Sequence, residues 1–445
     1  MYVDFSKAYD KIPRQILLQE LKAAGCGKRF LYMIKGIYKC TKFLLKSATI
    51  PVSMGVKQGA PMSCLLFVFY VDIKIRKINR YDPDGYLGVL NVMLLMDDTV
   101  ILATSREACI AKFSLLVEYC DNYGMKINNS KTQFMVINAE PADKRTIRTD
   151  HLDVQYCKEY WYLGSPITDD GSPLTVMRAH IKARSKHVLK FITFLQKNPD
   201  MPFSAKKAVA ESCIVSAILY GTETWLTSSF KPLEVLYNRV IKALLGVRIS
   251  TPNDLCYFEC GVSRLRDRIL KSRSNFMVKR VGTAPPDEPI SIAHMLIGSV
   301  RSPRYRSFRQ FETYQETDMR QHIISLRTKS RFNDYCNLNP LLVVHRIYSA
   351  GIPDSLRIAY SRLILSSHRL RSETGRWTRP ATPRENRLCN CGMHIQDEVH
   401  MLTQCEKTVH LRDQYNTLNM SINDIMQINP HALGTFIATC LKCYI

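Results

Sequence analysis

The chain has 445 residues and a formal net charge of +23, with 46% hydrophobic and 23% charged residues. Length and hydrophobic content are normal for a soluble globular protein of about two to four domains, whereas the net charge favours a polyanionic partner, with nucleic acid ahead of acidic membrane. The 15 cysteines are scattered and odd in number, which excludes a small disulfide framework and indicates a reducing compartment.

The first expected elements are a strand and two helices. Residues 2–5 are strand-like, and Asp4 would lie at or near the end of that strand. A helix is expected over residues 12–25. The glycine-bracketed turn at residues 55–63 then leads into an apolar helix over residues 61–78. Its glycines would let the backbone approach a base or a phosphate, and a plain loop-to-helix junction is the alternative.

Residues 91–103 (NVMLLMDDTVILA) predict a buried β-hairpin. Two apolar runs, residues 92–96 and 99–103, have strand length and flank Asp97 and Asp98 at the expected tip. Two adjacent carboxylates raise each other's pKa, and a bound divalent cation removes this electrostatic cost. The alternative is a solvated turn that happens to be acidic.

The segments after this hairpin complete an order of strands and helices that is typical of the α+β class. A capping box at residues 104–107 predicts a helix that ends at Gly124, and strands are expected at residues 125–128, 133–137 and 160–164. This order predicts a largely antiparallel sheet with helices on one face.

Five short segments occur in an order that is characteristic of one protein family. They are residues 4–10 (DFSKAYD), 55–63 (GVKQGAPMS), 95–98 (LMDD), 124–132 (GMKINNSKT) and 162–164 (YLG). In this order and at these separations they resemble the palm motifs of reverse transcriptases from non-LTR (LINE-type, jockey-like) retrotransposons. The resemblance implies a reverse-transcriptase palm. The chain departs from the family pattern at Met96, where the family more often has alanine.

The resemblance also implies the metal ligands of a polymerase. Asp4 and Asp97 would bind two Mg²⁺ ions, with Asp98 a weaker or more distant contributor. Two cations would activate a primer 3′-hydroxyl and stabilise the leaving pyrophosphate. Lys131 would be the acid that protonates pyrophosphate, and a solvated lysine is the alternative.

Further residues would contact the nucleotide and the template. Tyr9 would lie under the sugar and exclude a 2′-hydroxyl, unless it is an ordinary core tyrosine. The other expected contacts with nucleotide and template come from the second motif: Lys57, Gln58, Gly59 and Pro61. The family's fingers segment would precede Asp4, so we expect a chain truncated at its N-terminus, with weak or no activity alone.

The rest of the chain is expected to be helical and basic. Residues 180–196, 204–220 and 232–245 resemble the family's thumb, with a helical scaffold as the alternative. The next region carries two arginine clusters, the second interleaved with aromatic side chains, and linker-like stretches at residues 279–289 and 380–383. The clusters are Arg264, Arg266 and Arg268, and then Arg301, Arg304, Tyr305, Arg306, Phe308 and Arg309.

A C-x-C-x8-H-x4-C pattern lies near the C-terminus. Cys389, Cys391, His400 and Cys405 fit a tetrahedral structural zinc site, in which His394 could replace one ligand. The family has a Cys/His element here; the alternative is four incidental side chains. Cys440 and Cys443 stay unassigned.

Five segments are therefore expected. They are a palm without fingers (1–165), a helical thumb (166–262), a basic helical connection (263–386), a zinc-knuckle-like element (387–412) and a C-terminal tail (413–445). The expected function is RNA-directed DNA polymerase, with Mg²⁺ and zinc as cofactors and with RNA template, DNA primer and dNTPs as partners. No membrane, secretion signal or endonuclease is expected, and the nucleus is the expected location. The alternative function is a non-catalytic nucleic-acid-binding remnant.

Overall fold

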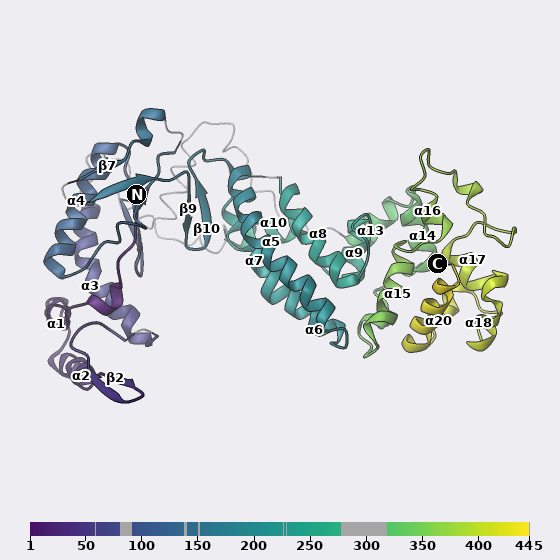
Figure 1. The fold of residues 1–445 in the computed structure, drawn as a ribbon, viewed down its shortest axis with the longest axis horizontal. Helices are drawn as coiled ribbons and strands as arrows, with labels where there is room; N and C mark the ends of the chain where they lie inside the picture. The colour runs from purple at the N-terminus through teal and green to yellow at the C-terminus, as the bar shows by residue number, and fades with distance from the viewer. Residues whose placement is uncertain are drawn as a thin grey trace. The chain divides into compact units, whose positions relative to one another are not determined.

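The computed structural model describes residues 1–57, 59–80, 91–137, 140–149, 152–225, 227, 229–276 and 318–444. For residues 43, 45, 73–77, 79 and 80 it describes the backbone alone. These residues form two compact units, which we call unit 1 (residues 1–176) and unit 2 (residues 177–276 and 318–444) (Figure 1). Gln58, the expected linker at residues 279–289 and the expected arginine-aromatic cluster at residues 301–309 lie outside the described residues.

Unit 1 is built on a mixed six-stranded sheet. Its strand order is β4-β5-β1-β6-β8-β7, and β1 lies between β5 and β6. The β6–β8 pair is parallel and the other pairs are antiparallel, so the expected α+β class is confirmed although the sheet is not antiparallel throughout. The strands are β1 (Tyr2–Val3), β4 (Val92–Leu95), β5 (Asp98–Ile101), β6 (Gln133–Phe134), β7 (Ile147–Arg148) and β8 (Asp153–Tyr156).

The helices of unit 1 share one core with the sheet. Val3 and Phe5 belong to a buried cluster together with apolar side chains of these helices, such as Leu17, Phe67 and Phe113. The helices are α1 (Arg14–Ala23), α2 (Lys28–Lys39), α3 (Pro61–Arg80) and α4 (Arg106–Tyr123), with short 3₁₀ turns η1 (Ala8–Lys11) and η3 (Pro141–Lys144).

A second, smaller apolar cluster contains Tyr2, whose side chain alternates with that of Val3 along β1. The ring of Tyr160 stacks on Tyr2 with 3.9 Å between centroids and 6° between planes. Tyr160 comes from a separate hairpin, β9 (Glu159–Tyr162) and β10 (Ser165–Thr168), which confirms the strand expected near residue 160. A further hairpin, β2 (Lys42–Leu45) and β3 (Ala48–Pro51), was not expected from the sequence.

Two local expectations are wrong. The N-cap of α4 is Ser105 rather than Thr104, because the hydroxyl of Ser105 accepts the amide N–H of Ala108 at 3.1 Å. Residues 125–128 do not form a strand, although Ile127 makes an isolated antiparallel bridge with Phe5. The predicted end of α4 is confirmed, since Gly124 is the C-cap in the left-handed conformation with φ 68°.

Unit 2 is helical where the structure describes it. The helix expected over residues 204–220 is interrupted by a π-helical turn, η4 (Ala210–Val215), between α6 (Phe203–Val209) and α7 (Ser216–Leu219). The other helices of its first part are α5 (Pro173–Lys197, beginning in unit 1), η5 (Thr222–Thr224), α8 (Lys231–Leu245), α9 (Asn253–Cys260) and α10 (Leu265–Phe276).

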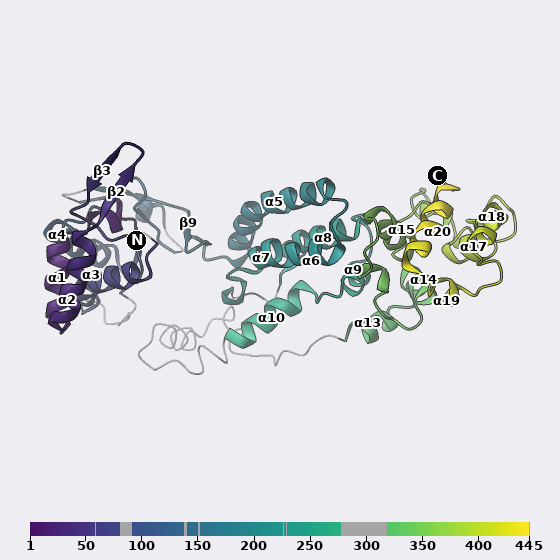
Figure 2. The ribbon, with the colours of Figure 1, turned by 90° about the horizontal axis from the view of Figure 1, so that it is seen from below.

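The second part of unit 2 contains shorter helices, and its two longest, α15 and α20, pack against each other (Figures 1 and 2). Among the described helices of the whole chain, none has both the length and the apolarity that a bilayer crossing requires. The elements are α13 (Met319–Ser325), α14 (Ser330–Leu338), η7 (Arg346–Tyr348), α15 (Asp354–Ile364), α16 (Arg371–Thr374), η8 (Arg384–Asn386), α17 (Glu398–Thr403), η9 (Glu406–Thr408), α18 (Val409–Gln414), α19 (Ile422–Ile425) and α20 (Pro430–Lys442).

Candidate active site

Three aspartates meet at one end of the β1–β5 pair. Val3 pairs with Thr99, so continuing the antiparallel register by one residue sets Asp4 opposite Asp98. The β4–β5 loop consists of Met96 and Asp97, with Met96 at φ 56°, and Asp98 already belongs to β5. The expectation that both aspartates form the tip is therefore wrong by one residue, but Asp97 stays next to the Asp4–Asp98 pair.

The electrostatics confirm that these carboxylates interact. The pKa of Asp98 is raised above its ordinary value of 3.8 by partial burial, by the charge of Asp97 and by the charge of Asp4. Deprotonating Asp98 beside these two charges therefore costs free energy in the protein alone. A hard divalent cation would reverse that cost, because carboxylate oxygens are its preferred protein ligands.

The segment after Gly124 holds Asp4 from the side. Asn128 donates a hydrogen bond from Nδ2 to Oδ2 of Asp4 at 3.0 Å, and the amide of Asn128 donates to the Asp4 carbonyl at 2.7 Å. Lys131, whose side chain is 68% exposed, lies 3.8 Å from the same carboxylate. The predicted Lys131 is therefore near the carboxylates, while Asn128 was not singled out although it lies within the fourth motif.

Tyr9 lies near the carboxylate of Asp97. Its ring stacks on the ring of Phe67 with 4.8 Å between centroids, so Phe67 covers one face of Tyr9. Burial, the neighbouring thiol of Cys64 and the charge of Asp97 raise the pKa of Tyr9 to about 12. The phenol is therefore neutral and close to Asp97.

Tyr160 and Tyr162 of β9 also lie near the carboxylates; Tyr162 belongs to the fifth motif, but neither tyrosine was predicted as a site residue. Burial together with the charges of Asp4 and Asp98 raises the pKa of Tyr160, and burial with Asp98 raises that of Tyr162. Their alternation in the EYWY stretch puts both rings on one face of the strand, which is the signal that could have identified them.

The glycine-bracketed loop packs tightly on the turn that carries Tyr9. Gly55 has φ 77°, and a Cβ there would lie 2.7 Å from the carbonyl oxygen of Asp10. The amide of Val56 donates to the Tyr9 carbonyl at 2.8 Å, and Arg14 donates from Nε to the Gly55 carbonyl at 2.9 Å. This loop is therefore fixed against Tyr9 by its own backbone.

The remaining predicted contacts follow in the same loop. Lys57 is exposed, Gly59 has φ 82° with open space around its α-carbon, and Pro61 is the first residue of α3 as predicted. Lys57 and Gly59 are exposed, which leaves room for a ligand beside this loop.

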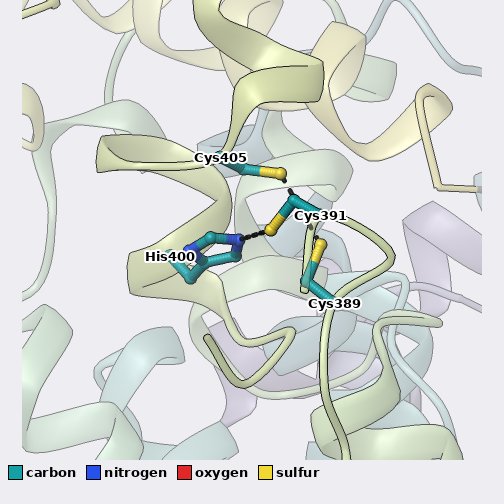
Figure 3. A group of neighbouring side chains, drawn as sticks. All are labelled: Cys389, Cys391, His400 and Cys405. Carbon is teal, nitrogen blue, oxygen red and sulfur yellow. Dashed lines mark hydrogen bonds between the residues drawn. The ribbon is translucent and has the colours of Figure 1, made fainter. Parts of the chain in front are cut away.

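The four predicted zinc ligands come together in unit 2 (Figure 3). Cys389, Cys391, His400 and Cys405 offer ligand atoms that all lie within 4.8 Å of one another. Sγ of Cys389 is 3.6 Å from Sγ of Cys405, and Sγ of Cys391 is 3.3 Å from Nε2 of His400. These separations match neighbouring vertices of a tetrahedral Cys₃His zinc site.

Local structure positions each of these ligands. The turn after Cys389 closes with a bond from the Gly392 amide to the Cys389 carbonyl at 2.9 Å, and Gly392 has φ 78°. His400 lies on α17, which Asp397 caps, and burial lowers the pKa of its imidazole. A neutral imidazole is the form that binds a metal. His394, the alternative ligand, is outside this group of four.

Comparison with known proteins identifies unit 1. A sequence model of the family "Reverse transcriptase (RNA-dependent DNA polymerase)" matches residues 1–167. These residues contain the three aspartates, Tyr9 and the glycine-bracketed loop.

Three relatives come from Drosophila melanogaster. "Putative 115 kDa protein in type-1 retrotransposable element R1DM" is 20% identical over 238 residues, 50% of this chain and 22% of the relative. "Probable RNA-directed DNA polymerase from transposon BS" is 24% identical over 290 residues, 60% of this chain and 30% of the relative. "Retrovirus-related Pol polyprotein from type-2 retrotransposable element R2DM" is 25% identical over 151 residues, 33% of this chain and 14% of the relative.

The chain spans less than a third of the length of each of these curated relatives. Within that span, the family match and the aspartate geometry concern the same residues. Residues 1–167 therefore form a reverse transcriptase domain, and the chain is related to proteins of non-LTR retrotransposons.

Proposed function

We propose that this chain is an RNA-directed DNA polymerase that transfers a nucleotide from a dNTP to a primer 3′-hydroxyl on an RNA template. The single observation that supports it best is the strand register that sets Asp4 opposite Asp98, with Asp97 in the adjoining turn, at one end of the sheet. Phosphoryl transfer depends on positioning and on charge neutralisation, and clustered carboxylates serve both through bound cations.

The carboxylates would hold two Mg²⁺ ions, with Asp4 and Asp97 as ligands and Asp98 as a weaker contributor. When bound, such ions polarise the reacting phosphate and neutralise the charge that develops on its oxygens. Asn128 keeps Asp4 oriented through the bond to its Oδ2. Lys131, near Asp4 and exposed, can deliver a proton to the departing pyrophosphate.

Tyr9 would serve as the floor for the nucleotide sugar. Its ring stacks on Phe67, and from this position it would clash with a 2′-hydroxyl while a deoxyribose would fit. Lys57, Gly59 and Pro61, with Gln58 between them, would contact the template and the incoming nucleotide from the loop that packs on Tyr9.

The parts beyond the palm would grip nucleic acid. We propose the palm at residues 1–165, the thumb at 166–262 and a basic connection at 263–386. On α5, Lys182, Lys186 and Lys190 are exposed and spaced by four residues, which puts them on one stripe of the helix. Such a stripe suits the phosphates of a template–primer duplex, and binding through it would weaken with salt. The proposal also expects action in the nucleus, where a chromosomal primer would be found.

The C-terminal Cys/His group would hold a structural zinc ion, within a small element at residues 387–412 that precedes a C-terminal tail at 413–445. The donor set of three thiols and one buried imidazole supports zinc over harder cations. The ion would tie the turn after Cys389 to α17 and to Cys405.

Primer extension tests the proposed activity. The purified chain is given poly(A), oligo(dT), dTTP and Mg²⁺, and Asp97→Asn is compared with Asp121→Asn, which changes an exposed aspartate on α4. We expect weak extension by the wild type and by the Asp121 variant, and a loss of at least about 100-fold relative to them in the Asp97 variant. Salt-sensitive binding of the template–primer without any extension would contradict the proposal and favour a non-catalytic nucleic-acid-binding remnant.

A further inference from the structure

A cavity of about 850 Å³ opens in unit 2 beside the C-terminal end of α8, α15 and α20. Beside it, two glycines bring α15 close to α20 and to the C-terminal end of α8. A Cβ at Gly434 on α20 would lie 2.8 Å from Cβ of Leu356, and one at Gly246 would lie 2.7 Å from Cγ1 of Ile358. The apolar side chains in its lining, which we call the floor, include Leu356, Ile358 and Leu441.

The rim of this cavity is basic. Arg248, Arg362, Arg369 and Lys442 line it, and no aspartate or glutamate does. Arg362, Arg369 and Lys442 are exposed, and within the described residues none of the three has a carboxylate at ion-pair distance. Four cations around an apolar floor indicate an anionic ligand with a flat apolar part.

An aromatic ring stands at the edge of the same cavity. Trp377 is 50% exposed, and the guanidinium carbon of Arg248 lies 4.5 Å from its ring centroid. Arg248 forms an ion pair with Glu373 at 3.6 Å, and Glu373 also pairs with Arg331 at 2.6 Å. This pair of stacked planar groups is therefore fixed before any ligand arrives.

We propose that the cavity binds single-stranded nucleic acid. One unpaired base would stack beside Trp377 and Arg248 over the apolar floor, and the adjoining phosphates would contact Arg362, Arg369 and Lys442. Single strands fit because their bases are free to leave a stack, whereas duplex bases are held inside the helix. The proposal goes beyond polymerisation, since none of these residues belongs to the unit that carries the aspartates.

Fluorescence anisotropy with the full-length chain in Mg²⁺-free buffer tests the charged rim. The probes are a fluorescein-labelled RNA 12-mer, a DNA 12-mer of the same sequence and the corresponding duplex. Arg369→Gln/Lys442→Gln is compared with Arg327→Gln/Lys329→Gln, which removes the same charge from an exposed turn outside the cavity. We expect single-strand affinity to fall about 10-fold in the first variant and less than about 2-fold in the second.

The stacking ring needs a separate variant. Trp377→Ala should weaken single-strand binding by about 10-fold while Trp377→Phe restores most of it, and neither should change duplex binding. Asp97→Asn should bind the 12-mers normally, so failure of polymerase activity and failure of this site are distinguishable. Tighter binding of RNA or of DNA would identify the sugar that is recognised.

Several results would overturn the proposal. The first is an equal loss of single-strand affinity in the cavity and control charge variants, and the second is unchanged binding in Trp377→Ala with a native circular dichroism spectrum. The third is competition by AMP as strong as that by the 12-mer. The fourth is competition by vesicles of anionic lipid in place of the oligonucleotide. The first two would leave only nonspecific attraction by the net charge. The last two would assign the cavity to a free nucleotide or to a membrane surface.

Discussion

Asn128 donates a hydrogen bond to Oδ2 of Asp4 at 3.0 Å although 124 residues separate the two along the chain. The amide of Asn128 also donates to the Asp4 carbonyl at 2.7 Å, so both side chain and backbone of Asp4 are held by one residue. The fourth motif is thus physically attached to the first, and these bonds hold the Asp4 carboxylate in one orientation at the strand end.

Replacing Asn128 should impair activity more than stability. Asn128→Ala removes a hydrogen bond to a partly exposed carboxylate, which costs about 1 kcal/mol of unfolding free energy. Because Asp4 loses its orientation, we expect the primer-extension rate to fall about 10-fold or more. Asn129→Ala, at the exposed neighbouring position, is the control and should leave both quantities unchanged. An Asn128 variant with the wild-type extension rate would remove this residue from the site.

Gly55 should tolerate no side chain. Gly55→Ala would need φ near 77° and would set its Cβ 2.7 Å from the Asp10 carbonyl oxygen, so we expect a loss of about 3 kcal/mol. Gly36→Ala is the matched control, because Gly36 lies in α2 with open space around it and should gain about 0.5–1 kcal/mol. Urea denaturation of both variants measures the difference, and equal midpoints would contradict the tight packing of this loop.

The sequence was sufficient for elements that depend on local chemistry. Pro61 begins α3 and Gly124 ends α4 in the left-handed conformation, as their residue types predict. Both effects act within one helical turn and need no tertiary contact. The spacing of Cys389 and Cys405 likewise predicted a cluster that the fold forms.

Other features depend on contacts between distant segments. The parallel β6–β8 pair and the β2–β3 hairpin have no local signal as strong as a cap or a proline. The hairpin tip lies one residue earlier than predicted, because Met96 adopts the positive φ that the turn requires. The sequence did not indicate this, since an apolar residue is not expected at such a position. Tyr160 was overlooked as part of the site, because its contact with Tyr2 arises only when two sheets meet.

Asp98 should make stability depend on pH. Its folded pKa is raised above 3.8 by burial, Asp97 and Asp4, so its favourable contribution is present below pH 3.8 and is lost as the pH rises through the folded value. The Asp98→Asn side chain does not ionise, so the stability of this variant does not fall as the pH rises through that pKa. We therefore expect the variant to unfold at a higher urea concentration than the wild type at pH 7, with the gap closing as the pH falls toward 4.

Saturating Mg²⁺ should make the wild type more stable than Asp98→Asn. Saturating Mg²⁺ stabilises the wild type by mass action and should stabilise Asp98→Asn less, since the variant offers one carboxylate fewer. A variant that is less stable than the wild type at pH 7 without cation would show that like-charge repulsion does not dominate at this end of the sheet.

The Cys/His group should carry about one equivalent of zinc. Cys405→Ser replaces a buried thiolate ligand, and we expect it to abolish stoichiometric zinc and to lower the melting temperature of unit 2. Cys213→Ser, at an exposed cysteine on the π-helical turn, should keep its zinc. Elemental analysis of dialysed protein measures both, and equal metal content in the two variants would exclude the proposed tetrad.

Metal-directed backbone cleavage can show whether Asp4, Asp97 and Asp98 together bind the proposed catalytic cations. Fe²⁺ with ascorbate and peroxide replaces Mg²⁺, and the fragments are mapped by mass spectrometry. The account predicts cuts close to residues 4 and 97, both suppressed by excess Mg²⁺ and both absent in Asp97→Asn. Cuts at only one of these two segments, or cuts that persist unchanged in Asp97→Asn, would contradict it.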